Sequence, residues 1–216
     1  MTPGLVDTRR EYDHLFSIYV PIAVGVFALI LVAVLLAIVI FRRRPPERAA
    51  RWHESNPIEG SYAVLLACVA AFLLYLTFTA EHKVDTVANH ERPAVVVDVT
   101  GSKWEWTFGY RAYGFSVRSG TVGRQPLVVP AGEAVRFAIT SIDVIHSLWI
   151  PALRYKHDAI PGSTQIATLT FPEGAFAGQC AEFCGLRHAD MIFTARAVAP
   201  ATFADWARSK GTAALR

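Results

Sequence analysis

Two long apolar segments lie within the first 80 residues of the chain. Residues 16–41 and 61–80 contain no Asp, Glu, Lys, Arg or His. As α-helices these segments would extend roughly 39 and 30 Å, and the hydrocarbon core of a bilayer is about 30 Å thick. The first segment is also longer than the h-region of a secretory signal, which runs about 7–15 residues. The pattern therefore predicts two retained membrane-spanning helices, over residues 16–41 and 61–80.

The segment between these two apolar runs is rich in arginine, whereas only two arginines precede the first run. Positively charged residues next to a membrane span remain on the cytoplasmic side. We therefore expect residues 42–60 to be cytoplasmic and both termini to lie outside. The arginines of the loop are Arg42, Arg43, Arg44, Arg48 and Arg51, and those before the first run are Arg9 and Arg10.

From residue 93 onward the pattern changes to short β-branched and aromatic runs separated by Gly and Pro. Such spacing is typical of a β-sandwich or Greek-key barrel. We expect residues 1–92 to form a transmembrane hairpin with a linker, and residues 93–216 to form an external all-β domain closed by a helix over residues 202–209. The expected strands are residues 94–100, 103–110, 127–130, 134–140, 165–171 and 191–198.

Composition excludes several other classes of protein. With 53% hydrophobic residues the chain is not intrinsically disordered. Three cysteines are too few for a disulfide-based scaffold. A net charge of +3 is too small to suggest a nucleic-acid partner.

The chemistry concentrates in one short segment, residues 179–191 (QCAEFCGLRHADM). It brings together the thiols of Cys180 and Cys184, the imidazole of His188 and the thioether of Met191. Thiolate, imidazole and thioether are the soft and borderline ligands that copper prefers. A thioether is an unusual ligand for zinc, and the ligand types do not suit magnesium or calcium. His146 lies upstream as a further candidate ligand.

Two other interpretations compete with copper on the residues alone. Two external cysteines often form a disulfide, here between Cys180 and Cys184. A structural zinc ion held by both cysteines together with His146 and His188 is also chemically reasonable. The placement of Met191 after His188 favours copper without excluding either alternative.

The segment closely resembles the CuA-binding loop of subunit II of haem–copper oxidases such as cytochrome c oxidase. Two further family motifs are present, one leading from Asp143 to Pro151 and one from Lys156 to Gly162. Subunits of this family have a two-helix hairpin followed by a cupredoxin domain, so the resemblance covers nearly the whole chain. The loop pattern C-x-E-x-C-x-x-x-H-x-x-M is filled by Cys180, Glu182, Cys184, His188 and Met191.

The resemblance implies a role for each residue of the loop. Cys180 and Cys184 would bridge two copper ions. One copper would be completed by His146 and Met191, the other by His188 and the backbone carbonyl of Glu182. The side chain of Glu182 resembles the family carboxylate that binds a magnesium or manganese ion at the interface with subunit I, although a solvated loop charge is the simpler interpretation.

Two further roles follow from the resemblance. Trp104 matches the tryptophan that receives the electron, although Trp104 and Trp106 alternate along an expected strand and would ordinarily be core residues. Glu59, just before the second apolar segment, resembles in placement a glutamate at the entrance of a proton channel. Glu54 is an equal rival, and both are equally well explained as solvated acids.

The implied function is that of the electron-input subunit of a terminal respiratory oxidase. It would accept electrons from cytochrome c or a similar donor and pass them to haem in subunit I, where oxygen is reduced to water with proton translocation. The implied partners are subunit I, subunit III, the external donor and the lipid bilayer, with haem only in the partner. The implied location is a prokaryotic plasma membrane or an equivalent energy-transducing membrane. Two alternatives remain, the small subunit of a CuA-containing nitric oxide reductase and a membrane-anchored copper-binding or chaperone domain.

Charge gives little indication of how a donor would dock. From Glu81 onward there are twelve acidic and fourteen basic residues, so composition shows no acidic docking face. Docking through an apolar patch, docking of an anionic donor and retention of the donor in a larger complex all remain open.

Overall fold

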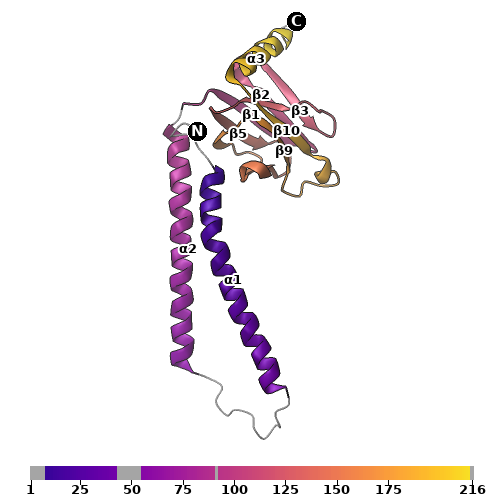
Figure 1. Cartoon of the computed structure of the whole chain (residues 1–216). Helices are drawn as coiled ribbons and strands as arrows, with labels where there is room; N and C mark the ends of the chain where they lie inside the picture. Colours follow the sequence, from indigo (N-terminus) through magenta and orange to yellow (C-terminus); the bar gives the residue numbers. More distant parts are fainter. Residues whose placement is uncertain (1–7, 43–54, 91, 215–216) are drawn as a thin grey trace. The chain divides into compact units, whose positions relative to one another are not determined.

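The computed structural model describes residues 8–42, 55–90 and 92–214 (Figure 1). The chain divides into two compact units. One unit, Glu11–His82, is helical, and the other contains the chain from Lys83 onward. Residues 43–54 lie outside the described part, and so do Glu54 and four of the five loop arginines; the predicted cytoplasmic side of residues 42–60 stays a prediction.

Two long helices make up the helical unit. They are α1 (Thr8–Phe41) and α2 (Asn56–His90), and each contains one of the expected spans. α1 has additional polar turns before its span, and α2 extends beyond its span at both ends. Both are long and apolar enough to cross a membrane, and α1 buries none of its described side chains. Helices of this length with exposed apolar side chains suit a lipid environment. The helices contact each other through the Tyr19 hydroxyl, which donates to the Leu73 carbonyl at 2.6 Å.

The second unit is a sandwich of two five-stranded sheets (Figure 1). The order of strands is β3-β2-β1-β5-β8 in the first sheet and β4-β10-β9-β6-β7 in the second. The pairs β1–β5 and β4–β10 are parallel, and the other pairs are antiparallel. The strands are β1 (Val95–Ser102), β2 (Glu105–Tyr110), β3 (Phe115–Gly120), β4 (Leu127–Pro130), β5 (Ala134–Ser141), β6 (His146–Ile150), β7 (Tyr155–Ala159), β8 (Gln165–Thr170), β9 (Gly174–Cys180) and β10 (Ile192–Val198).

The membrane-anchored, cupredoxin-like β-sandwich expected from the sequence is confirmed. The sequence pattern did not predict four of the strands, which are β3, β6, β7 and β9. β9 reads GAFAGQC, and its small residues carry little β-propensity, so its strand conformation depends on pairing with β6 and β10. The closing helix is α3 (Pro200–Ala214), longer than expected at both ends.

The core lies between the two sheets. In β1 the side chains of Val95, Val97 and Val99 are buried on one face, as strand alternation requires. Tyr110 of the first sheet reaches Val128 of the second: its hydroxyl donates to the Val128 carbonyl at 2.7 Å and accepts the Val128 N–H at 2.8 Å. Burial raises the pKa of Tyr110 well above its ordinary value, so the hydroxyl stays protonated. This side chain therefore joins the two sheets by buried hydrogen bonds.

Candidate metal centre

The loop between β9 and β10 carries most of the predicted ligands. β9 ends at Cys180 and β10 begins at Ile192, so Cys184 and Met191 lie on the connection. The Cys180 N–H donates to the Met191 carbonyl at 3.0 Å and closes the base of the loop. His146 joins from elsewhere in the sequence because it begins β6, which pairs with β9. The sandwich thus brings an upstream histidine to the cysteine loop.

The two thiols lie at the centre of the cluster. Cys180 Sγ and Cys184 Sγ are 3.9 Å apart, and both cysteines are free. Together with His146 they offer three ligand atoms within 4.8 Å of one another. The distance from Cys180 Sγ to His146 Nδ1 is 3.8 Å.

The remaining predicted donors surround the same pair of sulfur atoms. Cys184 Sγ lies 3.6 Å from His188 Nδ1 and 3.9 Å from Met191 Sδ. Cys180 Sγ lies 3.3 Å from the Glu182 carbonyl oxygen. Every donor atom predicted for the copper centre therefore contacts one of the two thiols. The side chains of His146 and Met191 are fully buried, both cysteines are nearly so, and His188 is half-buried.

Asp143 fixes the orientation of His146. Its Oδ1 lies 2.9 Å from His146 Nε2 and accepts the Val144 N–H, and its Oδ2 accepts the Lys103 N–H at 2.8 Å. Burial alone would raise the pKa of Asp143, but the hydrogen bonds from His146, Val144 and Lys103 hold it below its usual value. A carboxylate that accepts the proton of Nε2 leaves Nδ1 free to face Cys180, which is the arrangement found around metal-binding histidines.

Gly101 and Trp106 form the surface on which the His146 ring rests. They are register partners in β1 and β2 of the first sheet. A Cβ atom at position 101 would lie 2.9 Å from His146 Cδ2. The Trp106 ring meets the imidazole edge-on, at 5.9 Å between centroids. The first sheet therefore fixes the position of a ligand that belongs to the second.

The two thiols differ in acidity. Burial raises the pKa of both, but hydrogen bonding to His146 and to the backbone lowers that of Cys180 to about 7. The pKa of Cys184 is raised by burial and by the neighbouring Cys180 charge. Cys180 is therefore the first of the pair to become a thiolate, the form that binds metals.

The two tryptophans differ in burial. Trp106 is fully buried in the core, whereas Trp104 is half-buried in the turn before β2. Trp104 Nε1 donates to the Cys184 carbonyl at 3.2 Å. Trp104 therefore lies between the surface of the domain and a cysteine of the cluster.

The two predicted glutamates lie outside the cluster. The Glu182 side chain is exposed, and only its backbone carbonyl approaches the thiols. Glu59 lies in the first turn of α2, and its carboxylate accepts the Ser55 N–H at 3.1 Å. This bond satisfies a backbone donor next to the helix start, so Glu59 has a local structural role whatever else it does.

The loop and the sandwich that carries it have close counterparts among known proteins. Residues 116–198, which include all the predicted copper ligands, match the family model of the cytochrome c oxidase subunit II periplasmic domain. The periplasmic domain of subunit II of cytochrome oxidase (CoxB) of Bradyrhizobium japonicum is 30% identical, with a TM-score of 0.54 over 57% of this chain and 97% of that chain. The chain belongs to the cytochrome c oxidase subunit II family.

Curated members of this family extend the comparison. A probable cytochrome c oxidase subunit 2 of Streptomyces coelicolor is 31% identical over 67% of this chain, and the mitochondrial cytochrome c oxidase subunit 2 of Glycine max is 29% identical over 96%. The match spans 57% and 56% of these relatives, so the chain corresponds to little more than half of their length. Membership and the two apolar helices are consistent with a membrane-anchored subunit.

The sequence pattern did not predict the supporting roles of Asp143 and Gly101. Asp143 begins one of the family motifs, and a carboxylate three residues before a candidate histidine ligand is a recognisable signal for a residue that orients the histidine. Gly101 carried no signal at all, because only the packing of the two sheets brings it against His146.

Proposed function

We propose that this chain is the electron-input subunit of a respiratory haem–copper oxidase and that it holds a binuclear copper centre, CuA. The observation that carries the proposal is the contact of both thiols with two imidazoles and a thioether in one buried cluster. Family membership supports the same assignment.

The donor set fits copper better than zinc. Zinc sites are normally completed by cysteine, histidine or carboxylate, whereas Met191 offers a fully buried thioether in contact with Cys184. Thioether and thiolate sulfur together with imidazole nitrogen are typical of copper electron-transfer sites. In the proposed arrangement Cys180 and Cys184 would hold both metals, His146 and Met191 would complete one, and His188 and the Glu182 carbonyl would complete the other.

The bound copper pair would take up and release one electron. The chain keeps its ligands in place during that change: Asp143 holds the His146 ring, and the Cys180–Met191 backbone bond holds the loop ends. Fixed ligands lower the cost of reorganisation, which favours fast transfer. Trp104 is the proposed point of entry because its indole bonds directly to the Cys184 backbone.

The partners are part of the proposal. Cytochrome c or a similar protein would supply electrons outside, and haem in subunit I would receive them for oxygen reduction coupled to proton translocation, with subunit III in the same complex. Glu182 would bind the interfacial magnesium or manganese ion, and Glu59 would serve a proton channel. The chain would lie in a prokaryotic plasma membrane with both termini outside.

Copper loading requires reduced thiols, and a relative illustrates how this state can be reached. One solved structure, 29% identical to this chain, is the mixed disulfide intermediate between the thioredoxin-like protein TlpA and subunit II of cytochrome c oxidase. We propose that a thiol reductant likewise keeps Cys180 and Cys184 reduced before the metal binds.

Metal analysis and electron paramagnetic resonance of the full chain in detergent, reduced and loaded with copper, test the centre. We expect two coppers per chain and a mixed-valence signal, and loss of that signal in Cys184→Ser. One zinc ion and no copper signal would overturn the proposal. For the oxygen assignment, the complex is purified with its large subunit: oxygen consumption with reduced cytochrome c supports an oxidase, and nitric oxide consumption alone indicates the reductase.

A further inference from the structure

We propose that Phe193 is a positioning residue for the metal centre. Its ring packs over Gly178 and supports Trp106, which in turn holds the ring of His146 in place. This inference rests on the proposed function, because it concerns the geometry of the same site. The rings of His146, Trp106 and Phe193 are called the aromatic column below. Neither Phe193 nor Gly178 has a side-chain donor for a metal, so both would act through packing alone.

Gly178 and Phe193 lie in the layer of the core next to the proposed ligands. They are register partners in β9 and β10. Two residues nearer the metal loop on each strand, the Cys180 N–H donates to the Met191 carbonyl at 3.0 Å. Side chains two residues apart share a face of a strand, and Gly178 and Cys180 are both buried on the inner face of β9. A change at this layer is therefore adjacent to a cysteine and a methionine of the cluster.

The absence of a side chain at position 178 makes room for the Phe193 ring. A Cβ atom there would overlap ring atoms Cζ, Cε1 and Cε2 of Phe193. Glycine weakens a strand, and in a strand interior it often marks a place where another group approaches closely. The Phe193 ring therefore lies against the β9 backbone, which limits its movement on that side.

The aromatic column crosses between the two sheets. Phe193 of the second sheet meets Trp106 of the first, with 6.2 Å between ring centroids and 68° between ring planes. Trp106 then meets His146 of the second sheet at 5.9 Å and 65°. Both contacts have the edge-to-face geometry that aromatic rings favour. The position of the imidazole therefore depends on Phe193 through one intermediate ring.

The indole of Trp106 is a costly choice for a packing residue. Its ring is fully buried, and Nε1 has no hydrogen-bond partner within the part of the chain that the structure describes. A buried donor without a partner destabilises the fold, and a phenylalanine would avoid that cost. The indole therefore supports a requirement for a ring large enough to reach both Phe193 and His146.

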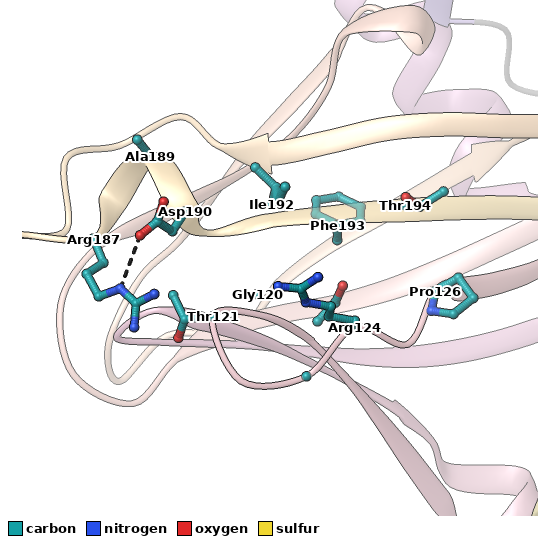
Figure 2. Close-up of a pocket in the computed structure, with 12 residues that line it drawn as sticks. Gly120, Thr121, Arg124, Pro126, Arg187, Ala189, Asp190, Ile192, Phe193 and Thr194 are labelled. Atoms are coloured by element: carbon teal, nitrogen blue, oxygen red, sulfur yellow. Dashed lines mark hydrogen bonds and ion pairs between the residues drawn. The ribbon is translucent and has the colours of Figure 1, made fainter.

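Phe193 also separates the aromatic column from a solvent cleft. The cleft has a volume of about 430 Å³ and is lined by Phe193 together with Ser119 and Thr194 (Figure 2). The Phe193 side chain is nevertheless buried, so its ring closes the cleft on the side of Trp106. A smaller side chain would extend the cleft toward the column. Because the apolar shell around a metal controls solvent access and thereby redox potential, Phe193 should influence the potential as well as the geometry.

The test compares Phe193→Leu with Phe137→Leu in the full chain in detergent. Phe137 is fully buried in β5 and meets Phe171 edge-on at 6.1 Å, so the control makes the same truncation in the same core. Both variants should lower the melting temperature to a similar extent. Only Phe193→Leu should lower copper affinity, about tenfold, and change the copper hyperfine splitting and the midpoint potential. Equal effects of both variants on the centre, or an unchanged centre in Phe193→Leu, would overturn the proposal.

A substitution at Gly178 tests whether the ring transmits the effect. Gly178→Ala should disturb the copper spectrum, because its methyl group displaces the Phe193 ring. In the Phe193→Leu background the same methyl group should have much less effect, since residues in contact are not additive. The same effect in both backgrounds would show that the ring transmits nothing. Phe193→Ile and Phe137→Ile, which suit a strand better, repeat the comparison if a leucine variant does not fold.

The ring protons of His146 separate this inference from the copper assignment. Nuclear magnetic resonance of the reduced, metal-free chain with labelled histidine gives their chemical shifts. We expect Phe193→Leu to move these shifts and Phe137→Leu to leave them unchanged, because the ring current of Trp106 changes with its position. Moved shifts without any copper signal in the unmodified chain would refute the copper centre while the support of His146 stands. Unmoved shifts with a normal copper signal would refute the aromatic column alone.

Discussion

Gly101 and His146 approach each other so closely that position 101 has no room for a side chain. The nearest ring atoms of His146 would lie 2.9 and 3.1 Å from an added Cβ. The two residues belong to different sheets, so their contact ties the position of a proposed metal ligand to the spacing of the sandwich. A residue without metal-binding chemistry thereby influences the metal site.

Replacement of this glycine should move His146 without removing a donor atom. We expect Gly101→Ala to weaken copper binding and shift the visible spectrum, because the added methyl group displaces the imidazole. Gly109→Ala in β2 is the control, since its added Cβ would meet its nearest neighbour at an ordinary 3.4 Å. Competitive copper titration compares the two variants, and equal affinities would show that the contact has no influence on the ligand.

Asp143 should act on copper through His146. We expect Asp143→Asn to lower copper affinity about 10- to 100-fold, because the orienting carboxylate is lost while the ligand itself remains. Asp98→Asn, which removes a surface ion pair with Arg111, is a control of the same chemistry. Titration of both variants with a chelator measures the difference, and an unchanged affinity in Asp143→Asn would leave His146 oriented by packing alone.

Substitution of Met191 and substitution of Cys184 should have different effects on the copper centre. Met191→Leu nearly conserves volume in the buried site, so we expect the fold and the bound copper to persist with a changed redox potential. Cys184→Ser removes one of the two thiols proposed to hold both coppers, so we expect it to abolish the binuclear signal. Potentiometry together with electron paramagnetic resonance distinguishes these effects. Equal copper loss in both variants would refute the expectation that Met191 tunes the potential more than it holds the metal.

Substitution of Trp106 should affect mainly stability, whereas substitution of Trp104 should affect mainly electron entry. Trp106→Ala should cost about 3–5 kcal/mol of unfolding free energy, because it empties a fully buried site. Trp104→Ala should cost less and should slow electron entry, since Trp104 is only half-buried and bonds to Cys184. Thermal melting and stopped-flow kinetics are measured on each variant. Normal kinetics in Trp104→Ala with a large loss of stability would make Trp104 a core residue.

Tyr110 should stabilise the sandwich in a pH-dependent way. Tyr110→Phe leaves the Val128 N–H and carbonyl unpaired, which should cost about 1–3 kcal/mol at pH 7. Burial raises the folded pKa of Tyr110, so this contribution is complete below the unfolded value of about 10 and declines as pH rises above it. Urea unfolding of both proteins at pH 7 and at pH 11 should show the difference narrowing; a constant difference would contradict this.

The sequence was most informative where chemistry or periodicity is local. The loop from Cys180 to Met191 carries most of the predicted ligands within twelve residues, and β1 carries the run of β-branched residues that predicts a strand. β9 was missed because a strand of glycine and alanine depends on its neighbours for its conformation. The contact of Gly101 with His146 could not be predicted, since it arises only when two sheets pack. The difference in burial between Trp104 and Trp106 could not be predicted either, because it depends on where the turn before β2 ends.

The closed base of the metal loop has a consequence for the order of events during biogenesis. Cys180 and Met191 are joined through the backbone, and β6 adds His146 only when it pairs with β9. The hydrophobic core extends through both sheets, and the side chains of Cys180, Cys184 and Met191 pack within it. We therefore expect the sandwich to fold around the reduced thiols before a metal binds. Cells short of copper should accumulate a folded, metal-free subunit. Until copper binds, the thiols of Cys180 and Cys184 in this subunit are open to oxidation.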